Sequence, residues 1–277
     1  MNHLQISLLL AIIFCNAPTS VVAADPEPKL SIPEDITFTA RCDQSQQRYV
    51  LMLPEMFNAQ KSHTLLIALH GHGSDRWQFV KETRGECKAA RDFAAKHQML
   101  YVSPDYRART SWMGPKAEAD LVQIIADLKK QYQIDQVYLC GGSMGGSSSL
   151  TFAALHPDLI DGVAAMNPTA NHLEYDKFQP AIQASFGGTK QDIPAEYKKR
   201  SAEYWPEKFT MPVSISVGGQ DQLVPPDSAR RLAQILKQLD KPVLLIDRPQ
   251  QGHSTSYEDS YSLLEFMKEK SVLQKQR

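Results

Sequence analysis

A serine surrounded by glycines lies near the middle of the chain, in the sequence GGSMG at residues 141–145. The strand-forming run DQVYLC precedes it, and the helix-compatible run SSSLTFAALH follows it. In a sharp strand-to-helix turn, small neighbours leave room for the tightly packed backbone and expose the serine hydroxyl. The pattern therefore predicts that Ser143 is a nucleophile. The alternative is a tight turn with no catalytic role, which the glycines alone would also fit.

A serine hydroxyl needs a base to become a nucleophile, and the base needs an orienting carboxylate. Asp221 directly follows the apolar run VSISVGGQ, and His253 follows LLIDRPQQG. Both residues should lie at the ends of later strands, in the order serine, acid, histidine. We expect Asp221 and His253 to form a catalytic triad with Ser143. Asp247 is a poorer candidate for the acid because it lies within a strand-like run.

Acyl transfer also needs donors for the oxyanion that forms when a serine attacks a carbonyl group. The backbone N–H of Met144, the residue after the nucleophile, is the expected first donor. The second donor should come from the turn after the run TLLIALHG, which reads HGHG at residues 70–73. We expect the backbone N–H of His72 there, with that of Gly73 as second choice. The two histidine side chains of this turn could simply lie on the surface.

The elements that would position these residues alternate along the chain between short apolar runs and helical patterns. ITFTARCDQ and QRYVLMLPE suggest an antiparallel pair, and later runs such as HTLLIALHG, MLYVSPDY, DQVYLCGG and MPVSISVGG suggest buried strands. Apolar residues at helical spacing occur within residues 121–128 and 232–239. This alternation predicts an α/β fold, with a mostly parallel central sheet and helices on both faces. Residues 168–209 contain no clear strand, so we expect a small insertion before the acid strand.

The motifs LHGHG, GGSMGG, GGQDQLVPP and QGHS occur in the order and rough spacing of α/β-hydrolases. The chain resembles this superfamily, and it is similar to compact secreted esterases of the feruloyl and acetylxylan esterase type. It also resembles the catalytic domain of prolyl-oligopeptidase-type peptidases, through the segment AEYKKRSAEYWPEKFTMPV. The resemblance implies the α/β-hydrolase fold and the triad roles of Ser143, Asp221 and His253. Such peptidases usually carry a large amino-terminal propeller, for which residues 25–277 leave no room beside this core. We therefore expect ester substrates.

The first residues predict export. Residues 4–14 form an apolar run as long as the core of a signal peptide and too short to span a bilayer. The apolar run is followed by small residues at 21–24, which would fit cleavage after Ala23 or Ala24. We expect a signal peptide at residues 1–24, one catalytic domain at residues 25–277, and a secreted or periplasmic protein with no membrane span after signal removal. An uncleaved membrane anchor is the alternative.

Composition argues against several other classes of function. The formal net charge is −1 and the basic residues are scattered, so nucleic acid is not an expected partner. The absence of CxxC and HExxH patterns gives no reason to expect a metal or another cofactor. Cys140 lies in the run before Ser143 and should be a buried free thiol. Cys42 and Cys87 could form a disulfide in an oxidising compartment.

These features predict an exported serine hydrolase that cleaves carboxylic esters in a small-molecule or polysaccharide-linked substrate. A serine peptidase acting on short peptides, a transacylase and a non-catalytic binding protein are the alternatives. Substrate contacts are expected from the segment after YVSPDY and from the insertion, namely from Arg107, Trp112, His172, Tyr175 and Phe178. An aromatic ring and an arginine would suit a sugar or phenolic ester, although Trp112 could equally belong to the core.

Overall fold

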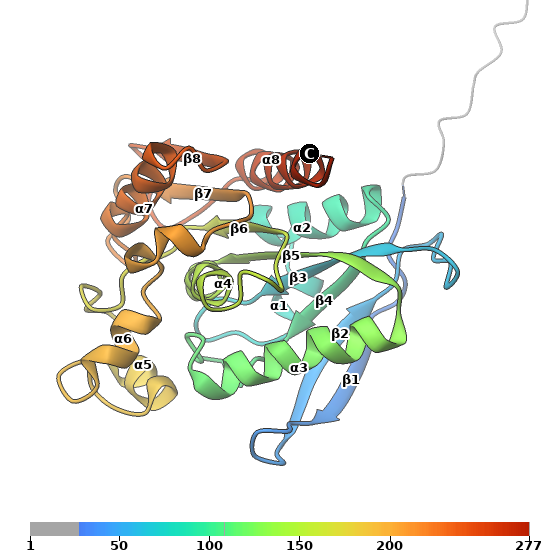
Figure 1. Cartoon of the computed structure of the whole chain (residues 1–277), viewed down its shortest axis with the longest axis horizontal. Helices are drawn as coiled ribbons and strands as arrows, with labels where there is room; N and C mark the ends of the chain where they lie inside the picture. The colour runs from blue at the N-terminus through green and yellow to red at the C-terminus, as the bar shows by residue number, and fades with distance from the viewer. Residues whose placement is uncertain (1–27, 108, 277) are drawn as a thin grey trace, which may run out of the picture.

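A computed structural model of the protein describes residues 28–107 and 109–276 (Figure 1). Its centre is an eight-stranded sheet with the strand order β1-β2-β4-β3-β5-β6-β7-β8. The hairpin of β1 (Glu34–Thr39) and β2 (Gln46–Met52) is antiparallel, and β2 pairs antiparallel with β4. The other pairings are parallel and join β3 (His63–Leu69), β4 (Leu100–Pro104), β5 (Ile134–Gly142), β6 (Gly162–Met166), β7 (Val213–Gly218) and β8 (Val243–Arg248). The predicted mostly parallel sheet is confirmed.

Helices cover both faces of the sheet (Figure 1). One face packs against α1 (Gln78–Lys81), α2 (Gly85–Lys96) and α8 (Tyr257–Lys275), and the other packs against α3 (Pro115–Gln131), α4 (Met144–Leu155) and α7 (Asp227–Gln238).

The two apolar layers follow from the alternation of side chains along each strand. In β3, Leu65 and Ile67 belong to the layer under α3 and α4, whereas Leu66 and Ala68 belong to the layer under α2 and α8. All four side chains are fully buried. A strand that is apolar at every position is the expected consequence of a sheet covered on both sides.

The insertion between β6 and β7 contains two short helices, α5 (Gln179–Phe186) and α6 (Pro194–Lys199). Two single 3₁₀ turns follow, η1 (Ala202–Tyr204) and η2 (Pro206–Lys208). Figure 1 shows α5 and α6 at the lower left, apart from the strands. The expectation of an insertion without a strand before the acid strand is confirmed.

The cysteines with described positions are free thiols. Cys140 is buried in β5, as expected. Cys42 is exposed in the β1–β2 turn and Cys87 is buried in α2, so the disulfide considered for this pair is not formed. The expected signal peptide at residues 1–24 lies outside the described residues. Within residues 28–107 and 109–276, no helix is long and apolar enough to cross a membrane.

Candidate active site

Ser143 occupies a strained turn between β5 and α4. Its backbone has φ 58° and ψ −120°, a conformation that side chains other than glycine rarely adopt. The Ser143 N–H donates to the carbonyl oxygen of Met166 at 2.8 Å, and the N–H of Ser147 donates to the Ser143 carbonyl at 2.9 Å. Strain of this kind persists only where the surroundings hold it, and it often marks a functional position.

The glycines beside Ser143 allow α4 to approach β3 closely. A Cβ atom on Gly145 would lie 1.9 Å from the carbonyl oxygen of Leu69, and a Cβ atom on Gly141 would lie 2.5 Å from the backbone of Gly145. Real Cβ atoms do not come so close to backbone atoms. The spacing of glycines in GGSMGG is therefore a packing requirement of the turn that exposes Ser143.

Asp221 and His253 form a hydrogen-bonded pair. Asp221 follows β7, and its Oδ2 lies 2.6 Å from Nδ1 of His253. The other carboxylate oxygen accepts the backbone N–H groups of Leu223 and Val224, each at 2.9 Å. Because both oxygens are held and the residue is buried, the carboxylate has a fixed orientation. The histidine can therefore present its Nε2 atom in one direction.

The loop after β8 carries His253 back across the sheet. β8 is the edge strand, three places from β5 in the strand order. In this loop, Thr255 accepts a hydrogen bond from Asn167 at 2.9 Å and bonds to Ser216 of β7 at 3.1 Å. Asn167 directly follows β6, the neighbour of β5. The loop is thus attached to the ends of β7 and β6, on the way to Ser143.

Two backbone N–H groups near this site are unpaired in the part of the chain that the structure describes. Met144 is the first residue of α4, so its N–H has no acceptor within the helix. The N–H of His72, in the turn after β3, has no acceptor either. Gly73, the second choice for this donor, gives its N–H to the carbonyl oxygen of Arg109 at 2.7 Å. Of these two, only His72 keeps a free N–H, and its role as oxyanion donor stays a prediction.

The side chain of His72 is packed among aromatic residues. Nε1–H of Trp112 donates to Nδ1 of His72 at 3.2 Å, so the proton of the neutral imidazole is on Nε2. Burial lowers the pKa of His72, which favours this neutral form. The ring of Phe178 lies 4.0 Å from that of His72, centroid to centroid. This side chain is therefore oriented by its neighbours and is not a loose surface group.

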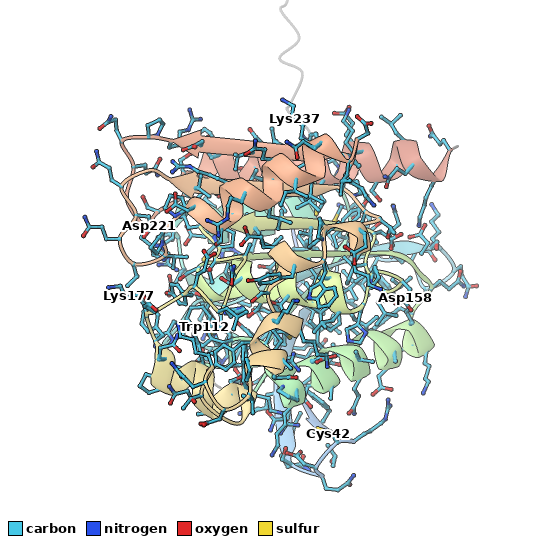
Figure 2. The ribbon with its side chains drawn as sticks, turned by 60° about the vertical axis from the view of Figure 1, so that its left-hand side comes forward. Cys42, Trp112, Asp158, Lys177, Asp221 and Lys237 are labelled. Carbon is cyan, nitrogen blue, oxygen red and sulfur yellow. The ribbon has the colours of Figure 1, made fainter. Side chains whose placement is uncertain are left out.

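Trp112 has no exposed surface and supports the other rings of this cluster. Its ring lies 5.4 Å from that of Tyr175 and 5.6 Å from that of Phe178. Figure 2 shows Trp112 on the same side of the molecule as Lys177 and Asp221. The tryptophan thus backs the wall of the site, and its role as a substrate contact stays a prediction.

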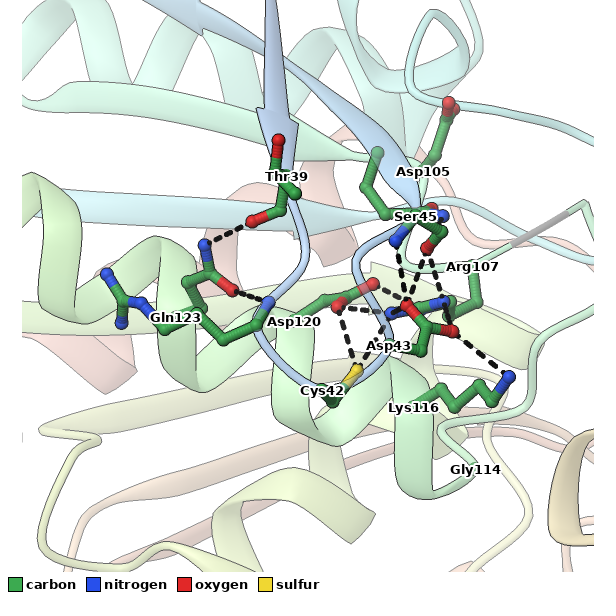
Figure 3. A network of polar contacts seen from close by, with 12 residues as sticks. Thr39, Cys42, Asp43, Ser45, Asp105, Arg107, Gly114, Lys116, Asp120 and Gln123 are labelled. Atoms are coloured by element: carbon green, nitrogen blue, oxygen red, sulfur yellow. Dashed lines mark hydrogen bonds and ion pairs between the residues drawn. The ribbon is translucent and has the colours of Figure 1, made fainter.

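The other predicted contacts lie in different surroundings. Arg107 lies between the β1–β2 turn and α3, and its guanidinium donates to Asp43 of the turn and to Asp120 of α3 at 2.7 Å each (Figure 3). His172 is fully buried, and burial together with Arg200 lowers its pKa to about 3. A substrate role for His172 would require its present surroundings to open. Arg107 lines a different pocket from the one beside Asp221. Both roles stay predictions.

Tyr175 lines a pocket beside Asp221. The pocket has a volume of about 450 Å³ and lies between the start of the insertion and the segment after β7. Its lining includes Asn171, Lys177 and Asp221 in addition to Tyr175. The hydroxyl of Tyr175 donates to the carbonyl oxygen of Leu223 at 3.0 Å, which ties the insertion to the loop that carries Asp221.

Sequence reasoning missed the packing under the HGHG turn. His70, which could have been a surface side chain, is fully buried. Its carbonyl oxygen accepts the hydroxyl of Tyr106 at 2.6 Å, and the N–H of Gly71 donates to Oε1 of Gln78 at 2.7 Å. The one signal in the sequence for the burial of His70 was its position directly after the apolar strand β3.

The sheet, the helices and the strained serine define an α/β-hydrolase. Residues 106–273 match the family model Peptidase_S9, the prolyl oligopeptidase family. The chain therefore belongs to the prolyl oligopeptidase family and is a hydrolase. No curated protein matches its sequence.

Similar solved structures include both peptidases and esterases. A putative dipeptidyl aminopeptidase IV from Bacteroides ovatus is 17% identical with a TM-score of 0.69, covering 88% of this chain and 36% of the other. An S-formylglutathione hydrolase from Agrobacterium tumefaciens is 15% identical with a TM-score of 0.67, covering 88% and 99%. A ferulic acid esterase from Anaeromyces mucronatus is 17% identical with a TM-score of 0.63, covering 90% and 94%. The chain thus spans about a third of the peptidase and nearly all of the S-formylglutathione hydrolase and the ferulic acid esterase. At these identities the likeness establishes the fold alone.

Proposed function

We propose that the protein is an exported serine hydrolase that cleaves carboxylic esters through an acyl-enzyme. Ser143 attacks the ester carbonyl, and His253 takes the serine proton as it does so. Asp221 holds the imidazole in the tautomer with hydrogen on Nδ1 and stabilises the positive charge that develops. The observation that carries this proposal is the 2.6 Å contact between His253 and an aspartate whose other oxygen is fixed by two backbone N–H groups.

The remaining steps need only groups of this chain and water. The backbone N–H groups of Met144 and His72 receive the oxyanion of each tetrahedral intermediate. His253 then gives its proton to the departing alcohol. Water, activated by the same histidine, releases the acid from Ser143 and restores the enzyme. This chemistry requires no cofactor.

The comparisons support an ester substrate. The ferulic acid esterase and the S-formylglutathione hydrolase named above match this chain over nearly their whole length. The peptidase matches only over about a third of its own length. The substrate would be a small-molecule or polysaccharide-linked ester, with Tyr175 and Phe178 at the mouth of the site.

A serine peptidase acting on short peptides is the second candidate. The family match, which covers residues 106–273, favours it. The two activities share the triad and the oxyanion donors, and they differ in the leaving group that the site accepts.

The proposal of an exported enzyme also includes removal of residues 1–24 as a signal peptide, with residues 25–277 as the catalytic domain.

Labelling and a substrate screen test these proposals together. A fluorophosphonate probe should label the wild-type protein at Ser143, and Ser143→Ala should lose both labelling and hydrolysis while remaining folded. Ser262→Ala, on the exposed side of α8, is the matched control and should keep both. The screen compares p-nitrophenyl acetate, methyl ferulate, acetylated xylan and dipeptide p-nitroanilides. Hydrolysis of the anilides alone would favour the peptidase, and labelling that survives in Ser143→Ala would exclude Ser143 as the nucleophile.

A further inference from the structure

The proposed oxyanion donor belongs to a turn whose direction is set by one peptide group. The N–H of Ser74 donates to the carbonyl oxygen of Gly71 at 3.2 Å, and Gly73 has φ 79°, as the third position of a type II turn requires. The carbonyl of Gly71 and the N–H of His72 are parts of the same planar trans peptide, so they point in opposite directions. Whatever holds the Gly71 carbonyl therefore aims the His72 N–H.

The side chain of His70 lies against that carbonyl. Nδ1 of His70 is 2.9 Å from the carbonyl oxygen of Gly71, and Nε2 is 3.2 Å from the carbonyl oxygen of Asp105. The residue is fully buried, and burial lowers its pKa, which favours the neutral ring with a single N–H. A neutral ring has one N–H, whereas its two nitrogens face two carbonyl oxygens, so the ring can donate to only one of them. The shorter contact is to Gly71.

His70 is itself fixed by the loop between β4 and α3. The hydroxyl of Tyr106 donates to the His70 carbonyl at 2.6 Å, and the two rings lie 4.6 Å apart. The same loop gives the carbonyl oxygen of Arg109 to Gly73 and the indole N–H of Trp112 to His72. The HGHG turn therefore rests on this loop at several points.

The backbone of the loop between β4 and α3 is strained. Four of its described residues have positive φ although none is glycine: Tyr106, Arg107, Trp112 and Met113. Such conformations persist when the surroundings over-determine them, and they concentrate where geometry matters for function. Figure 3 shows one restraint, in which the guanidinium of Arg107 is held between Asp43 and Asp120.

We propose that His70 is the positioning residue of the oxyanion hole: its Nδ1–H holds the Gly71 carbonyl, and the His72 N–H thereby faces the reacting carbonyl group. The inference rests on the function proposed above and adds a residue to it. His70 does not touch the substrate.

A matched pair of variants isolates the hydrogen bond. Asparagine and leucine have the same branching at Cγ, but only asparagine can donate to the Gly71 carbonyl. Loss of one oxyanion donor lowers kcat by about 10²- to 10³-fold in other hydrolases. We expect His70→Leu to lower kcat toward esters by about 10²-fold, with KM changed by less than about twofold, because the donor acts on the transition state. His70→Asn should keep kcat within about tenfold of the wild-type value.

Two further measurements separate positioning from loss of structure. Binding of a trifluoromethyl ketone, which forms an oxyanion on the serine, should weaken in His70→Leu by the same factor as kcat/KM. In the wild-type protein, ¹⁵N NMR should show the His70 proton on Nδ1. This second measurement needs no variant to fold.

The outcomes distinguish the two proposals. If the wild type hydrolyses no ester or anilide and takes no fluorophosphonate label, the proposed function fails and the role of His70 fails with it. If the wild type is active but the Leu and Asn variants have equal kcat, or if NMR places the proton on Nε2, the role of His70 is overturned and the proposed function stands.

Discussion

Replacing Arg200 with methionine should destabilise the protein by about 3 kcal/mol. Arg200 is the first residue after α6, and its side chain has no exposed surface. It donates to Glu196 at 2.6 Å, to the carbonyl oxygen of Met113 at 2.7 Å and to Glu118 of α3 at 2.8 Å. Methionine retains much of the side-chain volume and removes all three hydrogen bonds.

The magnitude follows from Glu118. Burial raises the pKa of this carboxyl group, but contacts with His156 and Arg200 outweigh burial and lower it from 4.5 to about 2. A decrease of this size corresponds to about 3 kcal/mol of stability at neutral pH, of which Arg200 supplies a part. Its loss also leaves the Met113 carbonyl without this donor, at a cost of about 1–3 kcal/mol. The total agrees with the effect of removing one partner of a buried ion pair.

The same carboxyl group predicts a pH dependence. The pKa of Glu118 is lower in the folded protein than in the unfolded chain, so its contribution is complete above about pH 4.5 and is lost as the pH falls toward 2. In Arg200→Met the pKa should return toward 4.5. The difference in stability between wild type and variant should therefore narrow between pH 7 and pH 3.

Urea unfolding followed by tryptophan fluorescence at both pH values measures this difference. Arg231→Met is the control, because Arg231 is 41% exposed while it pairs with Glu174 and Glu203. An exposed pair of this kind contributes about 0–1 kcal/mol. The reasoning would be refuted if Arg200→Met cost no more than this control, or if its cost were the same at pH 3 as at pH 7.

Three other substitutions test the site. Asp221→Asn should lower turnover by about 10⁴-fold, and a loss below tenfold would point to another acid. Changing Tyr175 and Phe178 together to alanine should reduce hydrolysis of a bulky aryl ester and spare an acetyl ester, whereas equal losses on both esters would mean that the two rings only support the fold. Gly145→Ala should lower both activity and Tm, because its Cβ atom would meet a β3 carbonyl oxygen at 1.9 Å. Gly252→Ala, where a Cβ atom meets nothing within 4 Å, should leave Tm unchanged.

The sheet could be predicted because its central strands contain nearly continuous apolar runs, such as Leu65–Leu69 of β3, which are a local property of the sequence. The pairing of Asp221 with His253 could also be anticipated, since parallel strands end at one edge of a sheet. The direction of Arg107 could not. Its φ of 90° turns the side chain toward the β1–β2 turn, and no local sequence pattern predicts a positive φ at an arginine. The burial of His70 had only one signal, its position directly after an apolar strand, because it depends on contacts with the loop after β4.

The strand order also has a consequence for when the protein can act. The proposed nucleophile follows β5, the proposed acid follows β7 and the proposed base follows β8, which is the last strand of the described sheet. During synthesis the chain emerges from its amino-terminal end, so a nascent chain would contain Ser143 and Asp221 before His253, the proposed base, has been added. The loop with His253 is then secured when α8 packs against α2. Under the proposed function, an unfinished chain should therefore be inert toward esters until His253 has been added.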